Sequence, residues 1–202
     1  MKLKRKDWDS CLHKNVLLEI YLKSRNSSFF SLGYMIAKIG KFYIFKTITE
    51  YGDLDGYVLY RKYGIEKIKT ADNYTQVFNN YINLLQDDNH FDNLDLENFY
   101  NKIPTGSINS IVRYCYDHNL VVTIDDFYSD CLLAGTIKSF NRQELVLDQE
   151  EYCKDYDVNN DEKIVTVKLN NISGFDLVTQ KTYLYQQYLR QTGNIKLVED
   201  DD

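Results

Sequence analysis

Residues 132–148 read LLAGTIKSFNRQELVLD, and this stretch has the pattern of two short strands joined by a tight bend. A related pattern lies 102 positions earlier in the chain, where Gly33 corresponds to Gly135 and residues 44–45 correspond to 146–147. Residues 78–81 (FNNY) and 185–188 (YQQY) extend this correspondence at a slightly larger offset. The sequence therefore predicts one small β unit that occurs twice.

The composition predicts a folded protein outside the membrane. The chain has 202 residues, of which 44% are hydrophobic and 14% are aromatic, so it can bury a core as one domain or two small ones. No apolar run approaches the roughly 20 residues that a membrane span needs. The basic segment at residues 1–9 lacks the apolar stretch of a secretory signal. We therefore expect a cytoplasmic protein with no membrane partner.

Charge and cysteine spacing exclude several classes of site. The formal net charge is -6, which repels polyanions from the surface as a whole but is compatible with a local basic patch. The four cysteines are far apart and have neither zinc-site nor redox-motif spacing, so we expect reduced thiols; they are Cys11, Cys115, Cys131 and Cys153.

The hydrophobic periodicity alternates between strands and helices. In the first half it predicts a short helix at 8–12, strands at 16–22, 29–39, 42–48, 57–62 and 65–68, and a helix from Asn73 to Leu85. In the second half it predicts helices near 96–103 and 108–115, strands at 120–124, within 132–148, at 164–168 and 172–177, and a closing helix. The polar connection at 86–93 is the best boundary, which gives domains 1–86 and 87–202.

Two parts of this pattern predict specific structural features. Alternation in residues 16–22 predicts a strand with one buried face. Gly33 and Gly135 lie inside predicted strands, where glycine usually indicates a strong bend or a close approach of another backbone.

A helix followed by five short strands, with a glycine in the second strand, resembles the Sm-like fold. Residues 135–141 resemble the opening of the first Sm motif and residues 145–148 resemble its close, while 32–34, 51–57 and 65–68 resemble uncharacterised bacterial Sm-like proteins. The resemblance implies an α+β fold of two tandem five-stranded Sm-like (SH3-type) β-barrels, each preceded and followed by short helices. It also implies contacts between barrels through strand edges near residues 57–62 and 164–168.

The RNA-binding residues of the Sm family are not carried over. Its aspartate position is Asn141 in one half and approximately Gly40 in the other, and its arginine-glycine pair is not intact at 61–65 or at 168–172. The uridine pocket of the family is therefore not expected.

A surface for RNA or a protein partner is predicted near the end of the fourth strand. Aromatic side chains on which single-stranded bases stack, together with basic residues, would form it. The alternative is that these tyrosines fill the core and the sheet edges. The predicted residues are Tyr57, Tyr60, Arg61, Lys62 and Tyr63.

One loop has part of a calcium-binding pattern. Oxygen-bearing side chains occupy its first, third, fifth and seventh positions, namely Asp155, Asp157, Asn159 and Asp161. Position six is Asn160 instead of glycine and position twelve is Thr166 instead of glutamate, which favours an ordinary solvated loop.

No catalytic motif occurs in the chain. The three histidines, His13, His90 and His118, share no metal or triad spacing, and there is neither a phosphate-binding glycine loop nor a nucleophile elbow. We therefore expect a non-enzymatic interaction module without a metal, cofactor or small-molecule substrate. Assembly with a protein partner or a second copy through strand edges is expected ahead of single-stranded RNA binding.

Overall fold

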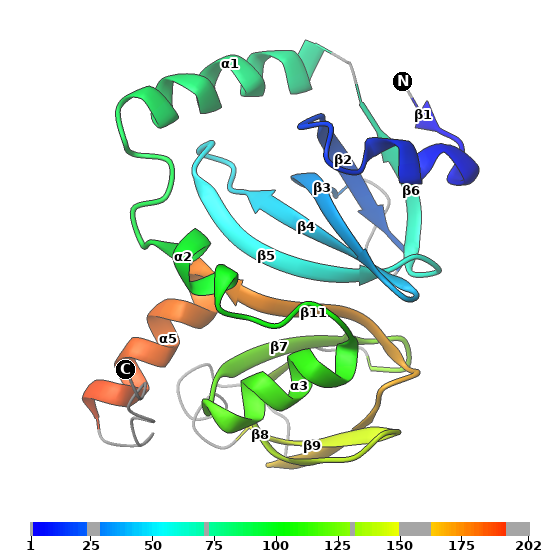
Figure 1. The fold of residues 1–202 in the computed structure, drawn as a ribbon, viewed down its shortest axis with the longest axis vertical. Coiled ribbons are helices and arrows are strands. Elements are labelled where there is room, and N and C mark those ends of the chain that lie inside the picture. Colours follow the sequence, from blue (N-terminus) through cyan, green and yellow to red (C-terminus); the bar gives the residue numbers. More distant parts are fainter. Residues whose placement is uncertain (1, 24–28, 71–72, 130–131, 150–162, 193–202) are drawn as a thin grey trace.

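The computed structural model describes residues 2–23, 29–70, 73–129, 132–149 and 163–192. Eleven strands form one open antiparallel sheet in the order β1-β6-β2-β3-β4-β5-β11-β7-β8-β9-β10 (Figure 1). The strands are β1 (Lys2–Leu3), β2 (Leu17–Leu22), β3 (Ser31–Ile39), β4 (Phe42–Ile48), β5 (Leu54–Arg61), β6 (Ile65–Lys69), β7 (Val121–Asp126), β8 (Leu133–Phe140), β9 (Glu144–Asp148), β10 (Ile164–Lys168) and β11 (Ile172–Thr179).

Helices cover the sheet and connect its halves. The described helices are the 3-10 helix η1 (Arg5–Cys11), α1 (Asn73–Asp87), α2 (Leu96–Asn101), α3 (Ile108–Asp117) and α5 (Gln180–Gln191). Ser107 begins α3 through a capping box with Ser110, and Thr179 begins α5 in the same way with Thr182. Within the described residues, no helix combines the length and the apolar character that crossing a bilayer would require.

The prediction of two separate closed barrels in tandem is wrong. Strand β5 of the first half pairs with β11 of the second, with Tyr60 opposite Gly174 and Gly56 opposite Thr179, so the strands of both halves join in one continuous open sheet. Unpaired N–H and C=O groups on two strand edges are satisfied by each other in this way. The strands nevertheless follow the same order in each half, β6-β2-β3-β4-β5 and β11-β7-β8-β9-β10.

One of the two strand edges that were expected to join the halves does so, and the other does not. The edge near 57–62 does pair with the other half, as β5. The other expected edge, residues 164–168, forms β10, which is the last strand of the sheet and does not take part in this junction. The residues that pair with β5 are those of β11.

The prediction of a single buried face for residues 16–22 is also wrong, because all six residues of β2 are buried. Leu18, Ile20 and Leu22 pack in a cluster with Trp8 from η1, while Leu17 belongs to a larger cluster that includes Ile82 of α1. The strand is therefore covered on both faces. Its one acidic residue, Glu19, accepts a hydrogen bond from the Tyr21 hydroxyl at 2.6 Å and lies 3.2 Å from the Lys69 ammonium.

The larger apolar cluster contains side chains from both halves of the chain. Tyr57 of β5 stacks on Tyr100 of α2 with ring centroids 3.9 Å apart, which covers the sheet near the junction. Cys115 is buried on α3, where loss of hydration raises the pKa of its thiol to about 12. Cys11 is also a buried free thiol, whereas Cys131 and Cys153 lie outside the described residues.

Of the two alternatives predicted at the strand glycines, a strong bend or a close backbone approach, the close approach is confirmed. A Cβ at Gly33 would lie 2.6 Å from the Lys46 carbonyl oxygen, and one at Gly135 would lie 2.0 Å from the Asp148 carbonyl oxygen. Because no side chain fits there, the neighbouring strands cross tightly at these two points.

Candidate functional site

A cleft of about 830 Å³ opens at the end of the sheet where turns from both halves meet. We call it the turn cleft. Segments far apart in the sequence form it: η1, the β3–β4 turn, the end of β5 with its following turn, the segment after β7 and the β10–β11 turn. Its lining residues are Arg5, Lys38, Gly40, Lys41, Arg61, Lys62, Tyr63, Phe127, Tyr128 and Asn170.

The lining of the turn cleft is cationic. Besides the buried Arg61, it contains Arg5, Lys38, Lys41 and Lys62, and no carboxylate is among its described lining residues. This local excess of positive charge is notable in a chain whose formal net charge is -6. A concave surface lined by one sign of charge concentrates its field, so the turn cleft attracts anions.

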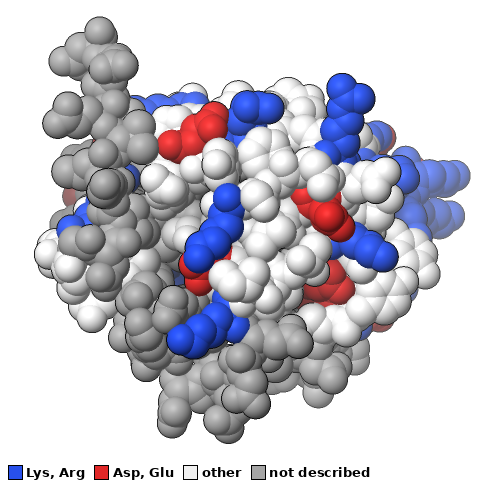
Figure 2. All heavy atoms as spheres, turned by 90° about the horizontal axis from the view of Figure 1, so that it is seen from below, with Lys and Arg blue, Asp and Glu red and all other residues white. Residues whose placement is uncertain are grey.

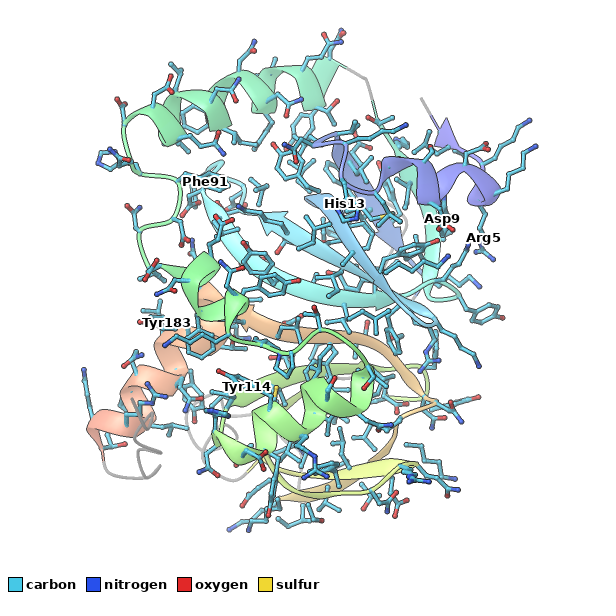
Figure 3. The ribbon with its side chains drawn as sticks, viewed as in Figure 1. Arg5, Asp9, His13, Phe91, Tyr114 and Tyr183 are labelled. Atoms are coloured by element: carbon cyan, nitrogen blue, oxygen red, sulfur yellow. The ribbon has the colours of Figure 1, made fainter. Side chains whose placement is uncertain are left out.

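One carboxylate beside the cleft moderates this charge. Asp9 lies on η1 near Arg5 (Figure 3), and its Oδ2 is 2.6 Å from the Lys38 ammonium while its Oδ1 is 4.0 Å from that of Lys62. The hydrogen bond from Lys38, followed by one from the Tyr43 hydroxyl, lowers the pKa of Asp9. Asp9 therefore stays ionised and holds two lysines at the rim.

Two exposed tyrosines flank the cations. Tyr63 is 65% exposed and Tyr128 is 84% exposed. The ring of Tyr63 packs edge-on against Phe127 with centroids 5.9 Å apart, and the Lys23 ammonium lies 3.5 Å from its centroid. Exposed rings beside cations can stack on planar aromatic ligands whose charged groups contact the lysines.

The structure separates the five residues predicted as an RNA or partner surface. Tyr57 and Tyr60 are buried in the core, as the alternative interpretation of the tyrosines predicts. Burial, followed by the charges of Glu97 and Asp92, raises the pKa of Tyr57. Only Lys62 and Tyr63 present side chains to the turn cleft as surface residues.

Arg61 lines the cleft, but its role is structural. Its Nε donates to the Ile172 carbonyl and its Nη2 to the Leu169 carbonyl, both at 2.6 Å, and the guanidinium lies 4.4 Å from the ring centroid of Phe42. Burial lowers the pKa of this side chain. Arg61 thus ties β5 to the β10–β11 turn and forms the floor of the cleft.

Sequence reasoning missed most of the cleft, namely Arg5, Lys38, Lys41, Phe127, Tyr128 and Asn170. They come from four separate segments, namely η1, the β3–β4 turn, the segment after β7 and the β10–β11 turn, and no local spacing connects these segments. The predicted calcium-loop residues, Asp155, Asp157, Asn159 and Asp161, lie outside the described residues. Within the described part of the chain, no group of three or more His, Cys, Asp or Glu side chains could hold a metal ion.

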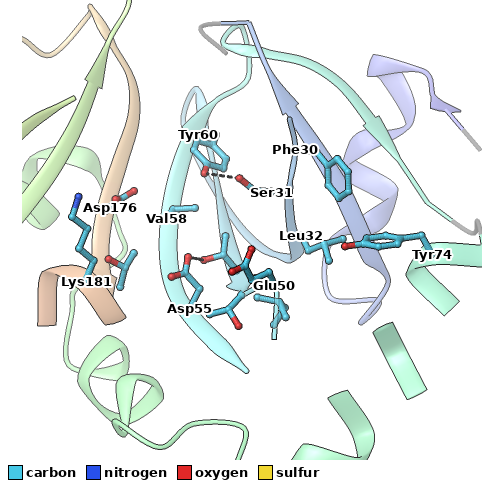
Figure 4. Close-up of a pocket in the computed structure, with 14 residues that line it drawn as sticks. Phe30, Ser31, Leu32, Glu50, Asp55, Val58, Tyr60, Tyr74, Asp176 and Lys181 are labelled. Carbon is cyan, nitrogen blue, oxygen red and sulfur yellow. Dashed lines mark hydrogen bonds between the residues drawn. The ribbon is translucent and has the colours of Figure 1, made fainter. Parts of the chain in front are cut away.

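A second cavity, of about 470 Å³, has the opposite electrostatic character (Figure 4). Three carboxylates line it, from Glu50, Asp55 and Asp176, with a single cation from Lys181. Burial, with a smaller contribution from the charge of Asp53, raises the pKa of Asp55, although the Thr47 hydroxyl donates to its carboxylate at 3.1 Å. This cavity does not suit an anionic ligand.

The outer edge of β10 is a further candidate site. Among the described strands, β10 pairs only with β9, through residues 164–168 opposite 144–148. Ile164 on this strand is 48% exposed. At the other end of the sheet, β1 covers part of β6, with Leu3 opposite Ile68. Among the described residues, the β10 edge is therefore the more open of the two.

Comparison of this chain with protein-family models, curated proteins and solved structures found no match. The resemblance to Sm-like proteins thus stays a prediction, and functional inference rests on the turn cleft and the β10 edge.

Proposed function

We propose that this chain is a non-enzymatic binding module that holds single-stranded RNA in the turn cleft. The observation that carries the proposal is the combination of four surface cations with two exposed tyrosines around one cleft that contains no lining carboxylate among the described residues. Lysine and arginine side chains neutralise phosphates, and tyrosine rings accept unstacked bases. Single-stranded RNA presents both groups, whereas a duplex hides its bases.

The charge arrangement elsewhere supports this choice of site. On the face of the molecule seen from below, cationic and anionic side chains are interspersed among uncharged ones (Figure 2). The second cavity contains more carboxylates than cations. A polyanion is therefore steered toward the turn cleft in preference to the second cavity.

The proposal predicts that Tyr63→Ala weakens RNA binding about tenfold, because base–aromatic stacking contributes about 1–3 kcal/mol per base. We expect Lys62→Ala to weaken binding and also to reduce the slope of log affinity against log salt by about 0.7, since one fewer counterion is released. Fluorescence anisotropy of a short labelled single-stranded RNA, at about 50 and 200 mM salt, measures both effects.

Two matched variants control this experiment. Asp9→Asn removes the carboxylate next to Lys38 and Lys62 and should tighten binding. Tyr51→Ala removes a tyrosine that is as exposed as Tyr63 but is not part of the cleft lining, and should leave affinity unchanged. Absence of binding at low salt, or equal losses for Tyr63→Ala and Tyr51→Ala, would refute the assignment of the RNA site.

A second candidate function is protein assembly through the β10 edge. Pairing of strand edges already occurs within the chain, because β5, the last strand of the first half, pairs with β11. Strand β10 holds the same place in the order of the second half, and its outer edge accepts no strand among those described. An exposed edge of this kind favours β-augmentation by a partner strand.

If assembly uses this edge, Ile164→Lys with Thr166→Lys should abolish it, because lysines on an edge strand oppose pairing with another chain. Sedimentation velocity over a range of concentrations would show the shift toward monomer. Gln143→Lys, which adds one positive charge in the exposed β8–β9 turn, should have no effect. Association that is not reduced at all by the double substitution would exclude the β10 edge.

A further inference from the structure

Helix α1 exposes a regular apolar stripe to solvent. Its core-facing side chains include the buried Thr75 and Ile82 and the partly buried Phe78 and Leu85. A second set, between 45% and 66% exposed, lies on the helix surface beside this core-facing set. We call this set the α1 seam; it consists of Tyr74, Val77, Tyr81 and Leu84.

The spacing of the α1 seam is that of a helix–helix contact. Its four residues follow one another at intervals of three, four and three, which is the a/d pattern of a coiled coil. A partner helix packs on side chains that are spaced at these intervals, whereas a partner sheet or irregular loop does not require this spacing. In Figure 1, α1 runs along the outside of the first half, and no other described element lies on its outer side.

Packing within the chain holds both tyrosines of the seam in place. Tyr74 contacts Phe30 and Phe78, with ring centroids 5.6 and 4.8 Å away. Tyr81 rests on Gly52, because a Cβ there would lie 2.6 Å from the Tyr81 ring. Val77 and Leu84 are the most exposed members, at 66% and 60%. The seam therefore alternates oriented aromatic rings with open aliphatic positions.

We propose that the α1 seam binds the α1 seam of a second copy. The two helices are antiparallel, and the two-fold axis that relates them crosses the pair at the level of residue 79 along the helix. In this register each tyrosine meets an aliphatic side chain of the other copy, because Tyr74 faces Leu84 and Tyr81 faces Val77. A parallel pair would instead place each tyrosine against its own equivalent. Large side chains opposite small ones interlock better than identical ones do.

Charge supports the same occupant and the same orientation. No charged residue occurs from Asn73 to Gln86, so two copies of this helix do not repel each other along the seam. Asp87 and Asp88 follow at the C-terminal end. Parallel helices would bring these four carboxylates together, whereas antiparallel helices separate them and place each pair near the positive end of the other helix.

The flanking amides are compatible with this register as well. Asn80 lies beside the seam on the side away from the core and one residue from the two-fold axis, so the axis brings it close to Asn80 of the second copy, where the two amides can exchange hydrogen bonds. A seam of four residues per copy is short. We therefore expect a weak dimer, as for other small transient interfaces.

Sedimentation equilibrium of the full chain tests the proposal. Val77→Asp should weaken dimerisation at least tenfold, whereas Leu184→Asp, which alters a leucine of similar exposure on α5, should not. Dimerisation should persist in the Ile164→Lys/Thr166→Lys variant, which distinguishes this contact from assembly at β10. A chain that is monomeric up to millimolar concentration, or equal effects of Val77→Asp and Leu184→Asp, would overturn the proposal.

The register has its own test. Asn80→Asp should weaken the dimer about tenfold by placing two carboxylates across the axis, while Asn83→Asp, the same change on a face away from the seam, should not. Mixing Asn80→Asp with Asn80→Lys should restore association between unlike copies. Circular dichroism confirms that each variant is folded. Equal weakening by Asn80→Asp and Asn83→Asp, or no recovery in the mixture, would overturn the antiparallel register.

Discussion

Gly56→Ala is expected to lower the free energy of unfolding by about 3 kcal/mol, because it forces a side chain between the two strands that join the halves. A Cβ at this position would lie 2.1 Å from the Val178 carbonyl oxygen and 2.5 Å from the Thr179 Cα. Gly56 also has a φ of 149°, a conformation that residues with a side chain rarely adopt. Both contacts are with backbone atoms of β11, which no side-chain rotation can relieve.

Urea unfolding followed by circular dichroism measures this effect. Gly106→Ala is the matched control, because an added Cβ there meets no atom within 4 Å, and its unfolding midpoint should stay close to that of the unsubstituted chain. An unchanged midpoint for Gly56→Ala would mean that β5 and β11 do not approach each other as described.

Arg61→Ala is expected to destabilise the fold by a similar amount, about 3 kcal/mol. The substitution removes two hydrogen bonds from a charged donor and leaves the Leu169 and Ile172 carbonyls without them. Hydrogen bonds to charged groups contribute about 1.5–3 kcal/mol each, and losses at one side chain do not add fully. The stacking of the guanidinium on Phe42 is lost as well.

Two further variants separate this role from charge alone. Arg61→Lys retains the positive charge but not the planar fork that reaches both carbonyls, so we expect it to recover only part of the lost stability. Lys62→Ala should change stability by less than about 0.5 kcal/mol, because Lys62 lies at the surface. If Arg61→Ala leaves the unfolding midpoint unchanged, Arg61 does not tie β5 to the β10–β11 turn.

This structural role changes how RNA experiments on the chain are interpreted. From the sequence, Arg61 and Tyr63 are equivalent members of one surface. In the structure a loss of RNA affinity in Arg61→Ala would report on the fold, whereas the same loss in Tyr63→Ala reports on the turn cleft. Lys62, Tyr63 and Tyr128 are therefore the informative positions.

The local patterns of the sequence located the elements well, since the strands at 42–48 and 164–168 have the predicted bounds and α1 begins at Asn73. Periodicity, caps and turn residues act over a few positions, so a single stretch contains all the information that they need. The close approach at Gly33 and Gly135 was also predictable, because a glycine inside a strand weakens it unless a bend or a neighbouring backbone requires the missing side chain.

The number of sheets and the members of the turn cleft depended on contacts between distant segments. Nothing local distinguishes a strand edge that closes its own barrel from one that pairs with a strand more than 100 residues later, as β5 does with β11. The tyrosines within 57–63 looked alike in sequence, yet the position of β11 and α2 decided that Tyr57 is buried and that Tyr63 is exposed.

The sequence by itself thus determined the strands, the helices and the positions where backbones must approach closely, because hydrophobic period and glycine act locally. Only the tertiary structure decided that one open sheet forms and that lysines from separate turns surround one cleft. Such an arrangement depends on which strand edges meet, and that is a property of the whole chain.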